Sequence, residues 1–106
     1  MKTKTELKLM SDVQLISNLC ELRGYTVDPF VFQDIITIYK GKKTTTFEMT
    51  YNDIMPIAVE LKVGINWTQE DVWSSYHPYT DLYCEDKNPL CAIVMCLILV
   101  LQDKAE

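Results

Sequence analysis

The feature that most constrains the fold is a run of twelve apolar, uncharged residues near the C-terminus, Leu90–Leu101. As a helix these residues would span about 18 Å, whereas a membrane-spanning helix needs about 20 apolar residues. Asn88 and Pro89 precede the run and are favoured as N-cap and first helical residue, and polar Gln102 follows it. The run therefore predicts a core helix at about 89–102 that is covered on more than one face, and not a membrane anchor.

Two further helices are predicted upstream of this run. Ser11 and Gln14 have the spacing of a capping box, and the apolar stripe after them indicates a helix over residues 12–23. The next helix has Asp53 as its predicted N-cap, and its apolar residues again recur at helical spacing. We expect this helix to end at Gly64, because glycine tolerates the left-handed conformation found at helix ends.

Strands are predicted between and after these two helices. The segments "DIITIYK" and "TTTFEMT", joined by "GKK", indicate a β-hairpin at about 34–49 with Ile36, Ile38 and Phe47 on its buried side. "YTVDPFVF" indicates an edge strand or an irregular lead-in, because a proline interrupts it. "INWT" predicts a short strand, and residues 69–87 are predicted to be irregular.

These elements predict a small α+β protein. The expected architecture is a layered α/β/α-type sandwich with three helices and one mainly antiparallel sheet of three to four strands. At 106 residues, of which 48% are hydrophobic, the chain has the size and composition of one globular domain. We expect residues 1–106 to form that domain, with residues 1–9 as a flexible N-terminal tail.

Charge and cysteine content limit the function classes. The net charge of −5 and the pI near 4.8 argue against direct binding of nucleic acid, which requires clustered Lys and Arg. The N-terminus lacks the apolar segment of a signal peptide, so we expect the protein to act in a cytosol, away from membranes and with reduced cysteines.

The four cysteines and the single histidine do not form a metal-binding pattern. Cys91 and Cys96 are five residues apart on the predicted helix and point in different directions. Cys84 and His77 offer only two ligands, whereas zinc sites use four donors. We therefore predict no metal and no cofactor, and we interpret the cysteines as small apolar core residues.

The segment 70–86 combines aromatic and acidic residues and is the predicted functional site. Tyrosine and tryptophan are typical of protein interfaces because each offers a large contact area and a polar group. An alternative is that these aromatics only fix the segment to the core, which applies most to Trp73 and Tyr83. The predicted partner-binding residues are Trp73, Tyr76, His77, Tyr79, Asp81, Tyr83, Glu85 and Asp86.

Catalysis at this segment is not predicted. His77 with Asp81 or Asp71 has the residue types of an acid–base pair, but such a combination is common by chance in an acidic chain. No nucleophile elbow, phosphate-binding glycine loop or zinc-protease motif accompanies it in the sequence. We expect no enzymatic activity.

Three stretches resemble a known family. "YNDIMPIAVELKVGIN", "KNPLCAIVMCLILVLQD" and "LMSDVQLISNLCELRGY" are similar to parts of the NinX-like phage proteins, a phage ABA-sandwich family of unknown function. That family commonly has Arg where this chain has Cys91, and the predicted hairpin has no counterpart that we can align. The resemblance implies a phage origin and a layered fold, and it implies no activity.

We therefore predict a phage-encoded, non-enzymatic accessory protein that binds a host protein or protein complex. The expected target is a bacterial defence system such as a CRISPR effector complex. Two alternatives remain open, namely an acidic nucleic-acid mimic and a self-associating phage structural or assembly protein. The sequence does not determine the oligomeric state.

Overall fold

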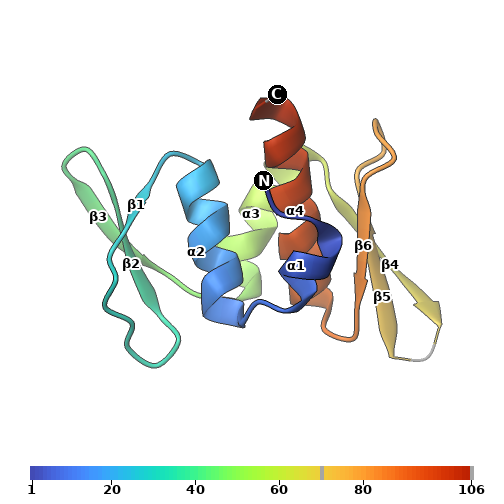
Figure 1. Cartoon of the computed structure of the whole chain (residues 1–106), viewed down its shortest axis with the longest axis horizontal. Helices are drawn as coiled ribbons and strands as arrows, with labels where there is room; N and C mark the ends of the chain where they lie inside the picture. The colour runs from blue at the N-terminus through green and yellow to red at the C-terminus, as the bar shows by residue number, and fades with distance from the viewer. Residues whose placement is uncertain (70, 106) are drawn as a thin grey trace.

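The computed structural model describes residues 1–69 and 71–105, in which helices lie between two antiparallel sheets (Figure 1). These described residues form an α+β fold with three substantial helices and one short one. Its elements are α1 (Lys4–Lys8), α2 (Asp12–Leu22), β1 (Thr26–Val27), β2 (Ile36–Lys40), β3 (Lys43–Phe47), α3 (Tyr51–Leu61), β4 (Gly64–Gln69), β5 (Val72–Tyr76), β6 (Tyr83–Asp86) and α4 (Pro89–Ala105).

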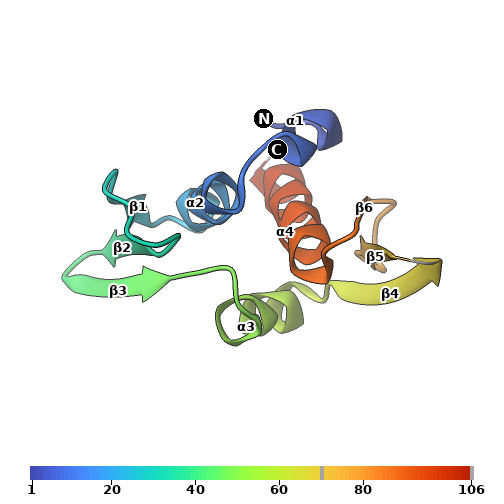
Figure 2. The ribbon, with the colours of Figure 1, turned by 90° about the horizontal axis from the view of Figure 1, so that it is seen from below.

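Helix α4 occupies the centre of the molecule. It contacts the other three helices and all three strands of the second sheet (Figure 2). Every residue from Ala92 to Ile98 is at most 1% exposed, and seven consecutive residues point in all directions around a helix. Other elements therefore surround α4, as the sequence predicted. None of the described helices has the length and hydrophobicity that a membrane span requires.

The first sheet has the strand order β1-β2-β3 and packs on α2. Strands β2 and β3 form the predicted hairpin, and its turn contains Gly41 at φ +63°. Ile36, Ile38 and Phe47 are buried, as predicted. The predicted capping box of α2 is also confirmed, because the side chains of Ser11 and Gln14 each accept a backbone N–H of the other residue.

The second sheet, β4-β5-β6, corrects the prediction that residues 69–87 are irregular. Strand β4 pairs antiparallel with β5, and β5 pairs antiparallel with β6. Strand β5 contains Ser74 and Ser75, and serine is mostly exposed in proteins. Ser75 is nevertheless fully buried, because its hydroxyl donates to the Gly64 carbonyl oxygen at 2.9 Å and so has a partner inside the fold.

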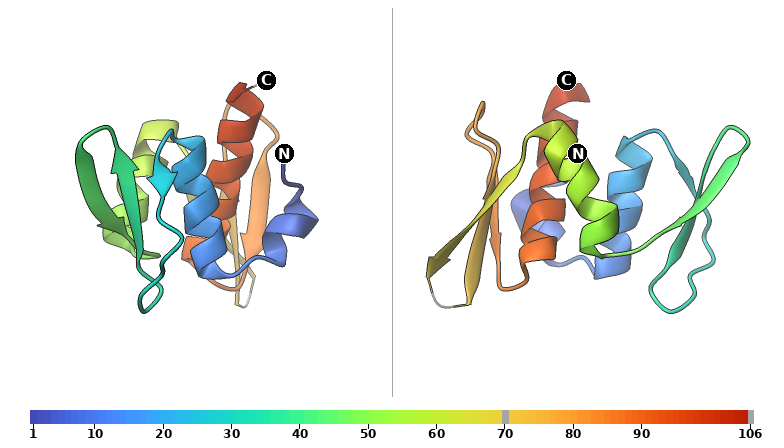
Figure 3. Two further views of the ribbon diagram at one scale, coloured as in Figure 1. Left: turned by 60° about the vertical axis from the view of Figure 1, so that its left-hand side comes forward. Right: turned by 180° about the vertical axis from the view of Figure 1, so that it is seen from behind.

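The layer order differs from the expected α/β/α arrangement with one sheet. The two sheets lie at opposite ends of the molecule, and the helices lie between them (Figures 1 and 3). The physical reason is that α4 is apolar on every side. One sheet covers only one side of α4, so α2 and α3 cover the other sides, and the first sheet then packs against α2.

The boundaries of α3 also differ from the prediction. Its N-cap is Thr50, whose hydroxyl accepts the Asp53 backbone N–H, while the Asp53 carboxylate accepts the N–H of Glu48. The helix ends at Lys62, which takes the left-handed conformation at φ +60°, and not at Gly64. Gly64 instead begins β4, where an added β-carbon would come into close contact with the ring of Tyr76.

Residues 4–8 form helix α1 where a flexible tail was expected. Thr3 and Glu6 form a capping box, and Leu7 is fully buried in the core. The backbone N–H of Lys2 donates to the Gln102 amide oxygen at 2.8 Å, and the Gln102 amide N–H donates back to the Lys2 carbonyl oxygen at 3.0 Å. Gln102 is itself buried, so this pair fastens the N-terminal segment to α4.

Candidate functional site

The eight predicted partner-binding residues lie on β5, on β6 and on the loop between them. Residues directly opposite each other in an antiparallel pair share one face of the sheet. Ser75 pairs with Cys84, and both are buried, so their side chains face α4. Trp73 pairs with Asp86 two residues further along, which places both residues on the same face as Ser75.

The remaining strand residues lie on the outer face of this sheet. Tyr76 pairs with Tyr83, and Ser74 pairs with Glu85. No described helix or strand covers this face in any of the views (Figures 1 to 3). The structure therefore divides the predicted site between two faces.

Five of the eight predicted residues are exposed, and we call them the tyrosine surface. The exposed fractions are 38% for Tyr76, 71% for Tyr79 and 47% for Tyr83, which leaves each phenol accessible to a partner. Asp81 lies on the loop with Tyr79, and Glu85 lies beside Tyr83 on β6. The tyrosine surface consists of Tyr76, Tyr79, Asp81, Tyr83 and Glu85.

Tyr76 has a structural role in addition to its exposure. Its ring lies across Gly64, the residue directly opposite it on β4. A β-carbon on Gly64 would lie 2.7 Å from Cζ of Tyr76, well inside van der Waals contact. Glycine at position 64 therefore leaves room for the Tyr76 ring to approach the β4 backbone closely.

Lysines contact two tyrosines of this surface. Nζ of Lys4 lies 3.3 Å from the ring centroid of Tyr83, and Nζ of Lys62 lies 5.4 Å from that of Tyr79. Such cation–π contacts contribute about 0.5–1 kcal/mol at exposed positions. They come from α1 and from the end of α3, so the surface carries charges of both signs.

The other three predicted residues, His77, Trp73 and Asp86, are half-buried. His77 is half-buried, and its Nδ1 lies 3.0 Å from the Thr80 hydroxyl, while its backbone N–H donates to the Leu82 carbonyl oxygen. These bonds close the loop between β5 and β6. Asp86 accepts the Asn88 backbone N–H at 2.8 Å, and the Asn88 side chain in turn caps α4. Trp73 is half-buried on the inner face.

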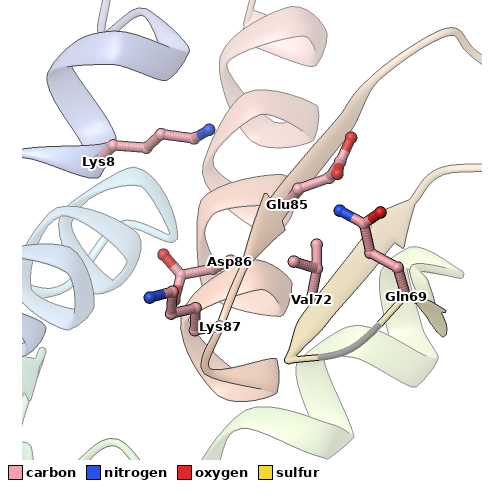
Figure 4. A pocket seen from close by; sticks show the side chains of 6 residues that line it. All are labelled: Lys8, Gln69, Val72, Glu85, Asp86 and Lys87. Carbon is pink, nitrogen blue, oxygen red and sulfur yellow. The ribbon is translucent and has the colours of Figure 1, made fainter.

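A shallow depression of about 440 Å³ adjoins the tyrosine surface at Glu85 (Figure 4). Its lining mixes lysines, carboxylates, one amide and one apolar side chain. Lys8 extends toward Glu85 from α1, whereas Asp86 and Lys87 point away toward the helical layer. Residue 70, which begins the predicted segment, lies outside the described residues. The residues that line the depression are Lys8, Gln69, Val72, Glu85, Asp86 and Lys87.

All four cysteines are buried, which confirms their interpretation as core residues. Burial raises the pKa of Cys20, Cys91 and Cys96 to about 12 and that of Cys84 to about 11, from an ordinary value of 9.0. The thiols are therefore protonated and poor nucleophiles near neutral pH. Among the described residues, no cluster of three His, Cys, Asp or Glu side chains is arranged to hold a metal ion.

Sequence reasoning missed several exposed aromatic residues outside the segment 70–86. Trp67 is 62% exposed on β4, directly opposite Trp73. Phe30 and Phe32 are 73% and 62% exposed on the connection between β1 and β2. The available signal was the sequence Phe30-Val31-Phe32, which lacks the alternation of apolar and polar residues that a half-buried strand requires.

Comparison of the chain with models of protein families, with curated proteins and with solved structures finds no match. The resemblance to the NinX-like phage proteins therefore stays a prediction.

The contact between Gly64 and Tyr76 gives a test of the outer face. Gly64→Ala should destabilise the wild-type protein by about 1 kcal/mol, because the new methyl group displaces the Tyr76 ring. In a Tyr76→Ala background the same change should be neutral or stabilising, since alanine is favoured over glycine in strands by about 0.5–1 kcal/mol. Urea unfolding of the four proteins measures this coupling. An equal cost of Gly64→Ala in both backgrounds would contradict the contact.

The buried thiols predict loss of stability at alkaline pH. Each folded-state pKa lies above its ordinary value of 9.0, so the protonated thiol favours the folded state below pH 9, and this contribution is lost as the pH rises toward 12. The free energy of unfolding should therefore fall between pH 9 and 11. Cys96→Val, which is similar in size and not ionisable, should reduce the slope by up to about 1.4 kcal/mol per pH unit. An unchanged slope would contradict the assignment.

Proposed function

We propose that this chain is a phage-encoded, non-enzymatic accessory protein that binds a host protein through the tyrosine surface. The observation that supports this proposal is a sheet face with no described element over it, which carries exposed tyrosines among carboxylates. The opposite face of the same sheet packs on α4, so the sheet is rigidly supported. A rigid aromatic surface loses little conformational entropy when it binds a partner.

The chemistry of this surface fits a protein partner. Tyr79 and Tyr83 are large side chains with hydroxyl groups, and residues of this type dominate binding energy in protein interfaces. Asp81 and Glu85 add negative charge beside them. We expect the complementary surface of the partner to be apolar at its centre and to carry basic residues opposite the two carboxylates.

The proposed target class is a bacterial defence system, with a CRISPR effector complex as the leading example. The support for this target is the small size of the chain, its net charge of −5 and the resemblance to phage proteins. Binding by an acidic protein would block a basic surface of such a complex without any catalytic step, and the host bacterial cytoplasm is the corresponding place of action.

Two alternative functions differ in the features that support them. A nucleic-acid mimic needs a continuous row of carboxylates, whereas Lys4 and Lys62 lie over the tyrosine rings here, which makes mimicry the weaker proposal.

Self-association gains support from the sheet edges. In the part of the chain that the structure describes, nothing pairs with the outer edges of β3 and β4, and unpaired edges can join a second copy.

A pair of matched variants tests the proposal. Tyr79→Ser with Tyr83→Ser should weaken binding at least about tenfold, because each change removes an interface anchor. Tyr51→Ser with Val59→Ser removes two exposed apolar side chains of α3 and should leave affinity unchanged. A partner would be recovered from bacterial host lysate with the wild-type chain, purified, and titrated with both variants by calorimetry.

The same proteins distinguish the alternatives. Affinity that falls steeply with salt would favour mimicry of nucleic acid, while an interface anchored by tyrosines should depend on salt only weakly. A higher oligomer in light scattering would favour self-association. Equal binding by the two variants, or no stoichiometric partner in the lysate, would contradict the proposal.

A further inference from the structure

The connection between β1 and β2 exposes three consecutive apolar side chains. Phe30 is 73% exposed, Val31 41% and Phe32 62%, and we call these three residues the apolar loop. This connection joins two strands of the first sheet, so the apolar loop lies across the helical layer from the tyrosine surface (Figure 1). Exposing two phenylalanines to water is unfavourable, since burying one such side chain gains about 1.5–3 kcal/mol.

Hydrogen bonds hold the start of this connection in place. The Asp28 backbone N–H donates to the Thr37 carbonyl oxygen at 2.9 Å, and the Asp28 carboxylate accepts both the Phe30 N–H and the Tyr39 hydroxyl, each at 2.8 Å. These two bonds also lower the pKa of Asp28, which is therefore ionised near neutral pH. The first residues of the apolar loop are thus fixed relative to β2.

A tight turn holds the other end of the apolar loop. Phe32 and Ile35 exchange two backbone hydrogen bonds, at 3.3 and 2.9 Å. Between them, Gln33 and Asp34 have φ of +50° and +64°, although neither is glycine. Left-handed backbone at a non-glycine residue costs about 1 kcal/mol or more, and such strain is concentrated at functional sites. The fold therefore maintains a strained turn that fixes the backbone of Phe32 relative to the start of β2.

We propose that the apolar loop is a second interaction surface, which inserts into an apolar pocket on another protein. Phe30 and Phe32 would be the anchors, and the fixed backbone would reduce the entropy lost on binding. Asp28 and Asp34 flank the loop, so the pocket that fits it has basic residues on its rim. This surface is independent of the tyrosine surface, and together the two surfaces allow the chain to bridge two proteins.

Charge and shape favour a protein pocket over a lipid surface or a second copy of this chain. Residues 28–35 contain two aspartates and no lysine or arginine, whereas insertion into anionic lipid is aided by basic residues. The depression beside Glu85 is open and has Val72 as its one apolar lining residue, so it does not match two phenylalanines. The two aspartates beside the exposed phenylalanines therefore favour an apolar pocket with basic residues on its rim, on a different protein.

Photocrosslinking tests this proposal with the full chain. A benzophenone amino acid would replace Phe30 in one protein and Tyr51 of α3 in a control, and each would be irradiated in a lysate of the cells in which the protein is made. We expect position 30 alone to give a discrete protein adduct. Mapped by mass spectrometry, the adduct should lie in an apolar pocket rimmed by Lys or Arg. The purified partner should bind Phe32→Ser at least about tenfold more weakly than wild type and Tyr79→Ser equally well.

Variants of the turn separate loop position from general stability. Gln33→Asn with Asp34→Gly preserves positive φ and should retain crosslinking, whereas Asp34→Pro forces a negative φ and should abolish it while circular dichroism shows an intact fold. Irradiation in the presence of anionic vesicles of phosphatidylcholine and phosphatidylglycerol tests whether the apolar loop crosslinks to lipid. Adducts to lipid or to the chain itself, or no adduct above the Tyr51 control, would overturn the proposal.

Discussion

The rest of the structure depends on the burial of α4 on all sides. A helix of this kind cannot lie on one face of a single sheet, because the opposite side of the helix would remain in water. The second sheet covers one side, α2 and α3 cover the others, and Leu7 of α1 fills the remaining gap. The Lys2–Gln102 pair then holds α1 in position. The central position of the helical layer follows from this one requirement.

The same requirement determines where binding surfaces can form. Each sheet uses its inner face to cover helices, so its outer face and its connections are directed away from the core. The tyrosine surface therefore lies at one end of the molecule and the apolar loop at the other (Figure 3). Local contacts fix each surface on its sheet. Gly64 and Lys4 position the rings of Tyr76 and Tyr83, and the turn at Gln33 and Asp34 positions Phe32.

Much of the fold was predictable because its signals are local. The Ser11 capping box, the Asn88-Pro89 start of α4 and the β2–β3 hairpin each depend on residues close together in the chain. Strands β5 and β6 were missed because polar and charged residues interrupt the apolar pattern that indicates a strand. Ser75 is polar and becomes compatible with burial only through its bond to Gly64, eleven residues earlier in the chain.

The candidate site was predicted in composition but not in arrangement. The segment 70–86 does carry exposed tyrosines and acids, yet strand alternation separates Trp73 and Asp86 from Tyr76 and Tyr83. The separation was not predicted, because residues 69–87 were expected to be irregular and not to form strands. The exposure of Phe30 was missed for a different reason, since an apolar residue is ordinarily assigned to a core, whereas Phe30 lies on a connection whose backbone is bound to Asp28.

Native-state hydrogen exchange, followed residue by residue, tests the central claim most directly. If α4 is enclosed as described, the amides of Ala92–Ile98 should exchange only through global unfolding, with the highest free energy of exchange in the protein. Edge strands β3 and β4 should exchange earlier, through local opening. Exchange of the α4 amides at a lower free energy than either sheet would contradict the account.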